Sequence, residues 1–214
     1  MIISERHNYV FVHIPKTGGT SLATALEGRV GPDDILIGDT PKARRRKGRL
    51  SGLTAPGRLW KHSTLADVAG LYPADAFVFT LVRNPWDRMV SYYHWLRVQR
   101  FDHVAVRAAQ RLSFAAFLRD ADMQASFRAY PAESYVTGPD GHLRCDLFAR
   151  IEVPADLDPL WEHLGFRLSM PHLNRSVRDA DWRSYYDAEG LEIVADIAAA
   201  DIARFGYGID NPPK

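Results

Sequence analysis

Residues 9–28 read YVFVHIPKTGGTSLATALEG, and this stretch decides how the chain is expected to fold. Residues 9–14 form a short β-branched and aromatic run that ends at Pro15, a pattern typical of a buried strand. A helical pattern begins at Ser21 and stops at Gly28. The sequence therefore predicts a strand, a glycine-containing loop and a helix in direct succession.

The loop in this unit has the composition of an anion-binding site. It consists of Lys16, Thr17, Gly18, Gly19, Thr20 and Ser21. Adjacent glycines let backbone N–H groups turn towards an anion, and the following helix directs its positive end to the same place. The hydroxyls add donors and the lysine adds a full charge. The alternative is a tight turn with an exposed lysine.

The rest of the chain alternates predicted strands and helices. Strands are expected over residues 76–82 and 147–153, and Asn84 followed by Pro85 is a strong helix-start signal. Thr64 and Asp67 resemble a capping box for a short helix. Further helices are expected over 113–121, 159–164 and 188–205. The order indicates an α/β fold class with a largely parallel sheet, in a single domain over residues 1–214.

Composition narrows the function classes. The chain has 214 residues, 46% hydrophobic and 25% charged, with a net charge of +1, which disfavours a nucleic-acid partner or a polybasic membrane binder. No apolar run approaches the ~20 residues that span a bilayer, so we expect a cytoplasmic protein. The single cysteine, Cys145, is expected to be a buried, inert thiol.

Charge is unevenly distributed along the chain. Residues 42–49 read KARRRKGR, while acidic residues are frequent near the C-terminus. The basic run has the composition to recognise an anionic acceptor or to close over a cofactor. A solvated, mobile loop is the commoner explanation of such a run, and we expect it here.

Two motifs carry a family resemblance. HIPKTGGTS at residues 13–21 and LVRNPWDRMVSYYHW at residues 81–95 resemble sulfotransferases that use 3′-phosphoadenosine 5′-phosphosulfate (PAPS), nearest to the carbohydrate O-sulfotransferases of the heparan and chondroitin type. The resemblance is strongest over residues 9–96 and continues weakly through 172–176 to 205–207. It implies a three-layer fold similar to the P-loop nucleotide kinases, with a central, mainly parallel sheet flanked by helices.

The same resemblance implies site residues. Binding of the 5′-phosphosulfate falls on Lys16, Thr17, Gly18, Gly19, Thr20 and Ser21. Binding of the 3′-phosphate falls on Arg83 and Ser91. The acceptor implied is a hydroxyl on a carbohydrate or glycolipid.

Sulfuryl transfer needs mainly positioning and charge stabilisation, and we expect no metal. Lys16 would stabilise charge on the leaving phosphate. His62 is the best candidate for the general base, because it lies between the two motifs, its ordinary pKa suits proton removal at neutral pH, and Lys61-His62-Ser63 resembles a segment of the uronyl 2-O-sulfotransferases. The alternative is a histidine that only shapes its loop, and His13 is expected only to pack.

Two other functions stay open on the sequence. One is an ATP-dependent kinase for a nucleotide or small molecule on the same fold, although the lysine precedes the glycines and Arg83 follows the second strand where such an enzyme would need an acid. The other is a nucleotide-binding module without catalysis. Arg175 and Ser176 are candidates for a late loop over the nucleotide, and the sequence leaves three aromatic residues as either core or acceptor-cleft walls: Trp182, Tyr185 and Tyr186.

Overall fold

A computed structural model describes residues 1–171, 178–179 and 181–209. The chain divides into two compact units. The first comprises Met1–Val82 and Ala132–Asn174, and the second comprises Arg83–Pro131 and Arg175–Lys214. Each unit is therefore assembled from two separate stretches of sequence. A single domain over residues 1–214 stays a prediction.

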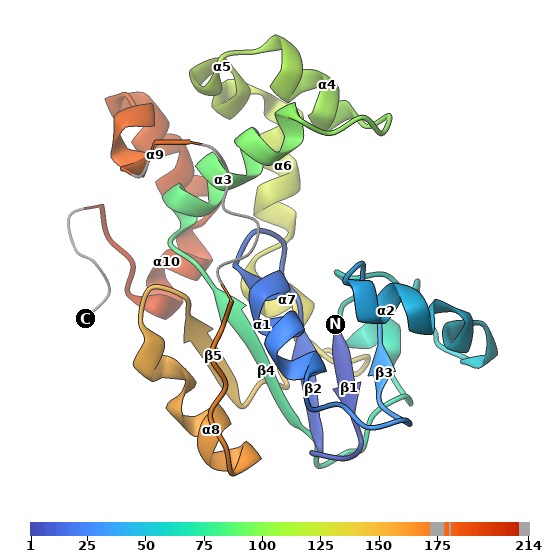
Figure 1. Ribbon diagram of the computed structural model, residues 1–214. Helices are drawn as coiled ribbons and strands as arrows, with labels where there is room; N and C mark the ends of the chain where they lie inside the picture. The colour runs from blue at the N-terminus through green and yellow to red at the C-terminus, as the bar shows by residue number, and fades with distance from the viewer. Residues whose placement is uncertain (172–177, 180, 210–214) are drawn as a thin grey trace. The chain divides into compact units, whose positions relative to one another are not determined.

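The first unit is built on a five-stranded sheet with the order β3-β1-β2-β4-β5 (Figure 1). Its strands are β1 (Ile2–Ser4), β2 (Tyr9–Val12), β3 (Ile35–Leu36), β4 (Phe77–Val82) and β5 (Leu147–Arg150). The neighbours β2, β4 and β5 run parallel, whereas β1 is antiparallel to both β2 and β3. The sheet is therefore mixed, and its parallel part contains the strand that leads into the glycine loop.

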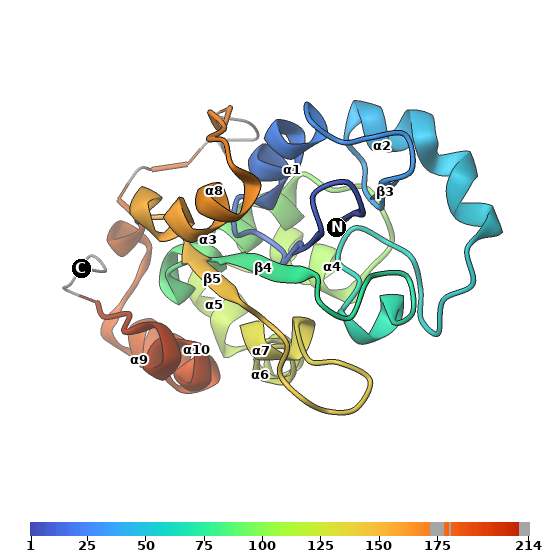
Figure 2. The ribbon, with the colours of Figure 1, turned by 90° about the horizontal axis from the view of Figure 1, so that it is seen from below.

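Helices cover both faces of this sheet. Figure 2 shows α1 (Gly19–Glu27) and α8 (Asp158–Leu164) on one side of the strands and α7 (Ala132–Tyr135) on the other. Apolar side chains of α1 and α8 share one buried cluster with alternate residues of β2 and β4. Central strands covered on both faces favour near-continuous apolar runs, which is why residues 9–12 and 77–82 were recognisable as strands. The predicted α/β architecture of a central sheet flanked by helices is confirmed.

The second unit is helical in its described part. It contains α3 (Pro85–Arg97), α4 (Val104–Arg111), α5 (Phe114–Arg119), α6 (Ala121–Ala129), η4 (Trp182–Tyr185), α9 (Ala188–Ile197) and α10 (Ala199–Phe205). The Asn84 Oδ1 atom accepts hydrogen bonds from the backbone N–H groups of Trp86 and Asp87, at 3.1 and 3.2 Å, so the predicted N-cap is confirmed. The expected helices 113–121 and 188–205 are each replaced by two shorter ones, the first because Asp120 is extended and caps a new helix.

The basic run does not form the expected loop. It lies in α2 (Pro41–Arg46) and the 3-10 helix η1 (Lys47–Gly52). Thr40 caps α2 by accepting a hydrogen bond from the Ala43 N–H group at 3.1 Å, and Pro41 supplies the first helical residue, so a local cap outweighs the repulsion between like charges. The prediction of a loop was wrong because Thr40 and Pro41 start a helix at this point.

Two smaller findings complete the fold. Cys145 is half-buried rather than buried, and its thiol donates to the Leu147 carbonyl at 3.3 Å. No helix in the described part of the chain combines the length and the apolar character needed to cross a membrane.

Candidate functional site

The glycine loop lies at the carboxyl edge of the three parallel strands. The Ile151 N–H group, just after β5, donates to the Val82 carbonyl at the end of β4, at 3.0 Å. The Ile151 side chain also lies against the loop, since a Cβ atom added to Gly18 would be only 2.1 Å from Ile151 Cδ1. The ends of β4 and β5 therefore adjoin the loop after β2. Arg83 is the next residue after Val82 in the chain.

The conformation of the loop suits an anion. Lys16 and Gly18 both have positive φ angles, 67° and 82°, and for a lysine this is a costly backbone conformation that recurs at functional sites. A backbone in which residues with positive and negative φ angles alternate turns its successive N–H groups towards one point. Gly18 is the N-cap of α1, no side chain caps this helix, and its first turn holds no acidic residue. The helix N-terminus therefore retains its positive character.

Thr17 has a different role from the one expected of its hydroxyl. The side chain is buried, and its hydroxyl donates to the Ile14 carbonyl at 2.9 Å. That proton holds the loop together and is not available to a ligand. Of the three hydroxyls predicted as donors, those of Thr20 and Ser21 remain candidates, whereas the Thr17 hydroxyl donates within the loop.

Two histidines lie beside the loop. A Cβ atom added to Gly19 would be 2.2 Å from the His13 ring, so only glycine allows the helix to start this close to the imidazole. The His13 and His62 ring centroids are 4.8 Å apart, and His62 Nδ1 is 2.7 Å from the His13 carbonyl oxygen. His62 therefore lies near the glycine loop, and His13 contacts both His62 and the loop. The sequence did not predict this position of His13.

The hydrogen bond fixes the chemistry of His62. A carbonyl oxygen only accepts, so Nδ1 carries the hydrogen and the neutral ring keeps its lone pair on Nε2. Burial lowers the pKa of His62 to about 3, with Lys61 acting in the same direction and the bond to the His13 carbonyl opposing it. Burial also lowers the pKa of His13 well below its usual range. Both rings are therefore neutral at physiological pH.

The expected capping box after His62 is present. The Thr64 N–H group donates to Asp67 Oδ2 at 2.7 Å, and the Asp67 N–H group donates to Thr64 Oγ1 at 3.2 Å. It begins a single turn of 3-10 helix, η2 (Ala66–Val68). The reciprocal bonds give the segment that carries His62 a fixed end.

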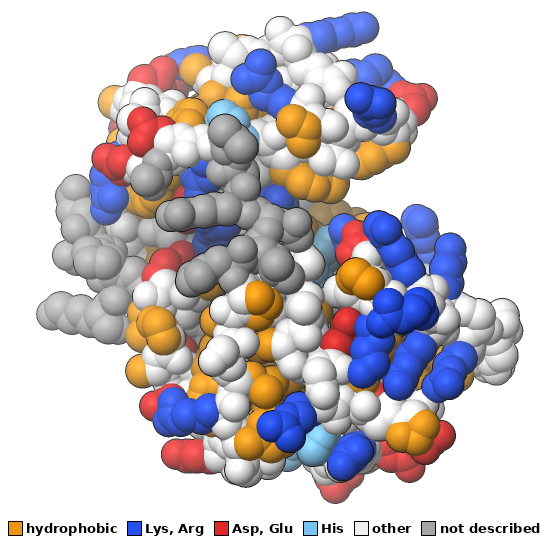
Figure 3. Space-filling model, in the orientation of Figure 1, with side chains coloured by type: hydrophobic (Ala, Val, Ile, Leu, Met, Phe, Trp, Pro, Cys, Tyr) orange, Lys and Arg blue, Asp and Glu red, His pale blue; other side chains and the backbone are white. Residues whose placement is uncertain are grey.

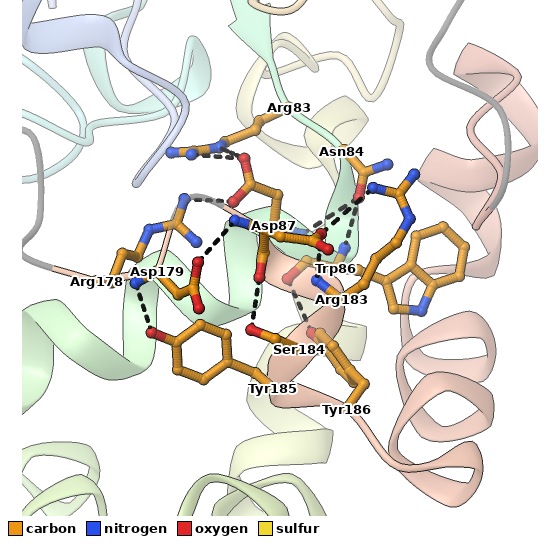
Figure 4. A network of polar contacts seen from close by, with 11 residues as sticks. Arg83, Asn84, Trp86, Asp87, Arg178, Asp179, Arg183, Ser184, Tyr185 and Tyr186 are labelled. Atoms are coloured by element: carbon orange, nitrogen blue, oxygen red, sulfur yellow. Dashed lines mark hydrogen bonds and ion pairs between the residues drawn. The ribbon is translucent and has the colours of Figure 1, made fainter.

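A second polar cluster lies within the helical unit (Figure 4). Arg83 donates from Nε and Nη2 to Asp87 Oδ2, at 2.8 and 2.6 Å, and Arg178 donates from Nη2 to the other oxygen of the same carboxylate. The Arg178 side chain is 10% exposed. Its Nη1 atom is buried and has no hydrogen-bond partner among the residues described. One carboxylate is therefore shared by two guanidinium groups, which leaves the cluster with a net positive charge.

Two members of this cluster, Asp87 and Arg178, are not predicted from the sequence. The spacing of Arg83 and Asp87, four residues apart, was a usable signal for an ion pair at a helix start. No local pattern points to Arg178, because its partner lies 91 residues earlier in the chain. Ser91 is buried on α3, four residues after Asp87, so both project from the same side of that helix.

The predicted site residues thus fall into two groups. The loop residues 16–21 and His62 belong to the first unit, and Arg83 and Ser91 to the second. Arg175 and Ser176 lie outside the described residues.

The three aromatic residues of the second unit have structural contacts. The indole rings of Trp182 and Trp86 stack at 6.1 Å, and the Tyr186 hydroxyl donates to the Trp86 carbonyl at 2.8 Å. The Tyr185 hydroxyl accepts from the Asp179 N–H group. Trp182 and Tyr186 are therefore part of the packing of the second unit.

A cavity of about 180 Å³ also lies within the second unit. Apolar side chains of α3, α6 and α9 and the ion pair between Arg88 and Asp201 line it, and none of the predicted site residues does. Among the residues described, no three His, Cys, Asp or Glu side chains gather where they could share a metal ion.

Comparison with known proteins bears on this arrangement. Residues 1–135, more than half of the chain, match the model of a protein family described as the sulfotransferase family. Among solved structures, the chain is similar to the crystal structure of mouse sulfotransferase SULT7A1 complexed with PAP. The sequence identity is 15% and the TM-score is 0.47, over 94% of this chain and 86% of that chain. None of the curated proteins matches the chain.

Proposed function

The chain belongs to the sulfotransferase family, and on that premise we propose that it transfers a sulfuryl group from PAPS to an acceptor hydroxyl. The observation that carries the proposal is the start of α1. It follows two positive-φ residues, has no side-chain cap and has no acidic residue in its first turn. An anionic group fits such a helix start without further support.

The proposal assigns the 5′ end of the donor to the loop. Backbone N–H groups of residues 17–20 supply neutral donors, and the hydroxyls of Thr20 and Ser21 add to them. Lys16 supplies a full positive charge where the leaving phosphate gains negative charge. A preorganised donor aimed at developing charge typically contributes about 3–4 kcal/mol to lowering a barrier. Lys16 is therefore assigned to catalysis as well as binding.

His62 is proposed as the general base. Its Nε2 lone pair faces away from the hydrogen bond that Nδ1 makes to the His13 carbonyl, so the ring accepts a proton without changing tautomer. The low pKa means that His62 is already deprotonated at neutral pH. PAPS is anionic, and a negative charge near His62 favours the protonated ring. Binding of PAPS therefore makes His62 a stronger base.

We assign the 3′-phosphate to Arg83 and Ser91, and we add Arg178 to this pair. Arg83 follows directly on β4, the strand that pairs with β2 ahead of the loop. Arg178 shares Asp87 with Arg83 and has a buried N–H group without a partner among the residues described. A doubly charged phosphate suits a pair of guanidinium groups. For the acceptor, we propose a hydroxyl on a carbohydrate or glycolipid.

A direct assay tests the proposed reaction. Purified protein is incubated with PAPS and a mixture of sugar acceptors, and the release of adenosine 3′,5′-bisphosphate is followed. We expect release that depends on an acceptor and falls at least about 100-fold in His62→Ala, the size of a typical general-base contribution. Bisphosphate binding without turnover in any acceptor mixture would favour a binding module. Phosphate transfer from ATP with Mg²⁺ would favour a kinase.

A further inference from the structure

The exposed side chain of Trp60 lies beside the proposed general base, His62. It is 42% exposed, whereas Trp86, Trp161 and Trp182 are each less than a tenth exposed. A single exposed aromatic side chain is unremarkable by itself. The Trp60 and His62 rings, however, are 5.1 Å apart at their centroids and cross at 87°. The exposed indole therefore adjoins the proposed general base.

Hydrogen bonds to the buried Ser63 hydroxyl fix the turn that contains Trp60. The Ser63 hydroxyl is buried and accepts a hydrogen bond from the Trp60 N–H group at 2.9 Å. The same hydroxyl lies 2.7 Å from the Arg58 carbonyl and 2.8 Å from the Trp60 carbonyl, to either of which it can donate. Gly57 donates to the Asp67 carbonyl at 3.1 Å. An aromatic ring on a turn that hydrogen bonds already fix loses little conformational entropy when a ligand binds to it.

The surroundings of the indole are basic. The Arg58 guanidinium lies 5.5 Å from the centroid of the Trp60 ring, and Lys61 Nζ pairs with Asp39 at 2.6 Å. Asp39 directly precedes Thr40, the cap of α2. Figure 3 shows Lys and Arg side chains gathered over α2 and η1, and the exposed ones include Arg44, Arg45 and Lys47. A ligand on Trp60 therefore meets positive charge beside the ring.

We propose that Trp60 and Arg58 form an acceptor subsite for an anionic sugar, an inference that rests on the proposed sulfotransferase function. The apolar face of a pyranose ring packs on the indole, and its carboxylate or sulfate pairs with Arg58. An acceptor hydroxyl then reaches His62 Nε2. Its O–H bond breaks as the proton passes to Nε2, its oxygen forms a bond to sulfur, and the bond from sulfur to the leaving phosphate oxygen breaks with its electron pair on that oxygen.

Two sugars that differ only at C6, where one has a carboxylate and the other a neutral hydroxymethyl group, provide the test. Methyl β-D-glucuronide and methyl β-D-glucoside are compared as acceptors of the wild-type protein and of Trp60→Ala, Trp60→Phe and Arg58→Gln. We expect Trp60→Ala to raise KM for both sugars by about tenfold or more with little change in kcat, and Trp60→Phe to retain most of the affinity. We expect Arg58→Gln to raise KM for the glucuronide alone.

Each other outcome overturns a defined part of the inference. Unchanged KM for both sugars in Trp60→Ala overturns the subsite, and a wild-type preference for the glucoside overturns the anionic assignment. Tyr130→Ala, which removes an exposed aromatic side chain of the second unit, is the control and should leave KM unchanged. Adenosine 3′,5′-bisphosphate affinity should be the same in all variants. Failure of the wild type to bind the bisphosphate would overturn the proposed function, and the subsite with it.

Discussion

The two polar clusters hold their geometry by different means. Around the glycine loop, position is set by shape: two positive φ angles, the close approach of Gly19 to the His13 ring and two neutral imidazoles. Around Asp87, position is set by charge, because two guanidinium groups share one carboxylate. We therefore expect the first cluster to lose function when atoms are added to it, and the second to lose stability when a charge is removed from it.

Adding one methyl group to the loop gives the largest expected effect. Gly19→Ala places a Cβ atom 2.2 Å from the His13 ring, and the ring cannot retreat because it is buried. We expect sulfuryl transfer to be lost, as measured by bisphosphate release from PAPS. Gly48→Ala is the matched control, since a Cβ there meets nothing within 4 Å. Near-normal activity in Gly19→Ala would show that shape does not set this cluster.

Removing the charge of the loop is expected to act on rate more than on binding. Lys16→Ala should lower kcat about 100- to 1000-fold, as for loss of one electrostatic donor to a developing charge. The affinity for adenosine 3′,5′-bisphosphate, measured by calorimetry, should change much less. Equal losses in kcat and affinity would mean that Lys16 only binds the ground state.

Removing the charge of the second cluster is expected to act on stability. In Asp87→Asn both guanidinium groups lose their carboxylate, and we expect the free energy of unfolding in urea to fall by about 3 kcal/mol, as for a buried ion pair that loses one partner. The control is Asp158→Asn in the exposed pair with Arg167, where we expect a change below about 1 kcal/mol. Equal changes in the two variants would contradict a charge-held cluster.

The smallest expected effect, taken per pH unit, is a dependence of stability on pH that comes from the imidazoles. His13 and His62 take up protons near pH 6.5 in the unfolded chain but not in the folded one, because burial lowers both pKa values. The unfolded state then binds more protons as pH falls from 7 to 5. The free energy of unfolding should therefore decrease, by at most about 1.4 kcal/mol per pH unit for each histidine.

A single substitution sharpens this pH test. His62→Gln keeps a side-chain donor near the His13 carbonyl but does not titrate, and so it should make the decrease between pH 7 and 5 shallower. Urea unfolding at a series of pH values measures the slope for both proteins. The same slope in the variant and the wild type would show that His62 titrates normally in the fold.

Local signals account for what the sequence predicted. The run at residues 9–14 and the Asn84-Pro85 helix start are readable because neighbouring residues alone determine them. The strands β1 and β3 are too short for a pattern to show, at three and two residues, and depend on pairing with β2 and with each other. Their position comes from the sheet and not from their own composition.

The candidate site also contains parts that local sequence determines and parts that depend on contacts between distant residues. The glycine loop and His62 were predicted from adjacent residues and from family motifs. The contact of His62 with the His13 carbonyl joins positions 49 residues apart, and Arg178 meets Asp87 over 91 residues, so no window of sequence contains either pair. The exposure of Trp60 depends on how the turn around Ser63 folds.

Calorimetric titration of the full chain with adenosine 3′,5′-bisphosphate, beside titration with ATP and Mg²⁺, tests whether the protein binds the sulfuryl donor proposed for it. We expect tight binding of the bisphosphate without added Mg²⁺, and binding of ATP that is weaker by about tenfold or more. Tight binding of ATP with Mg²⁺, together with no heat from the bisphosphate, would contradict it.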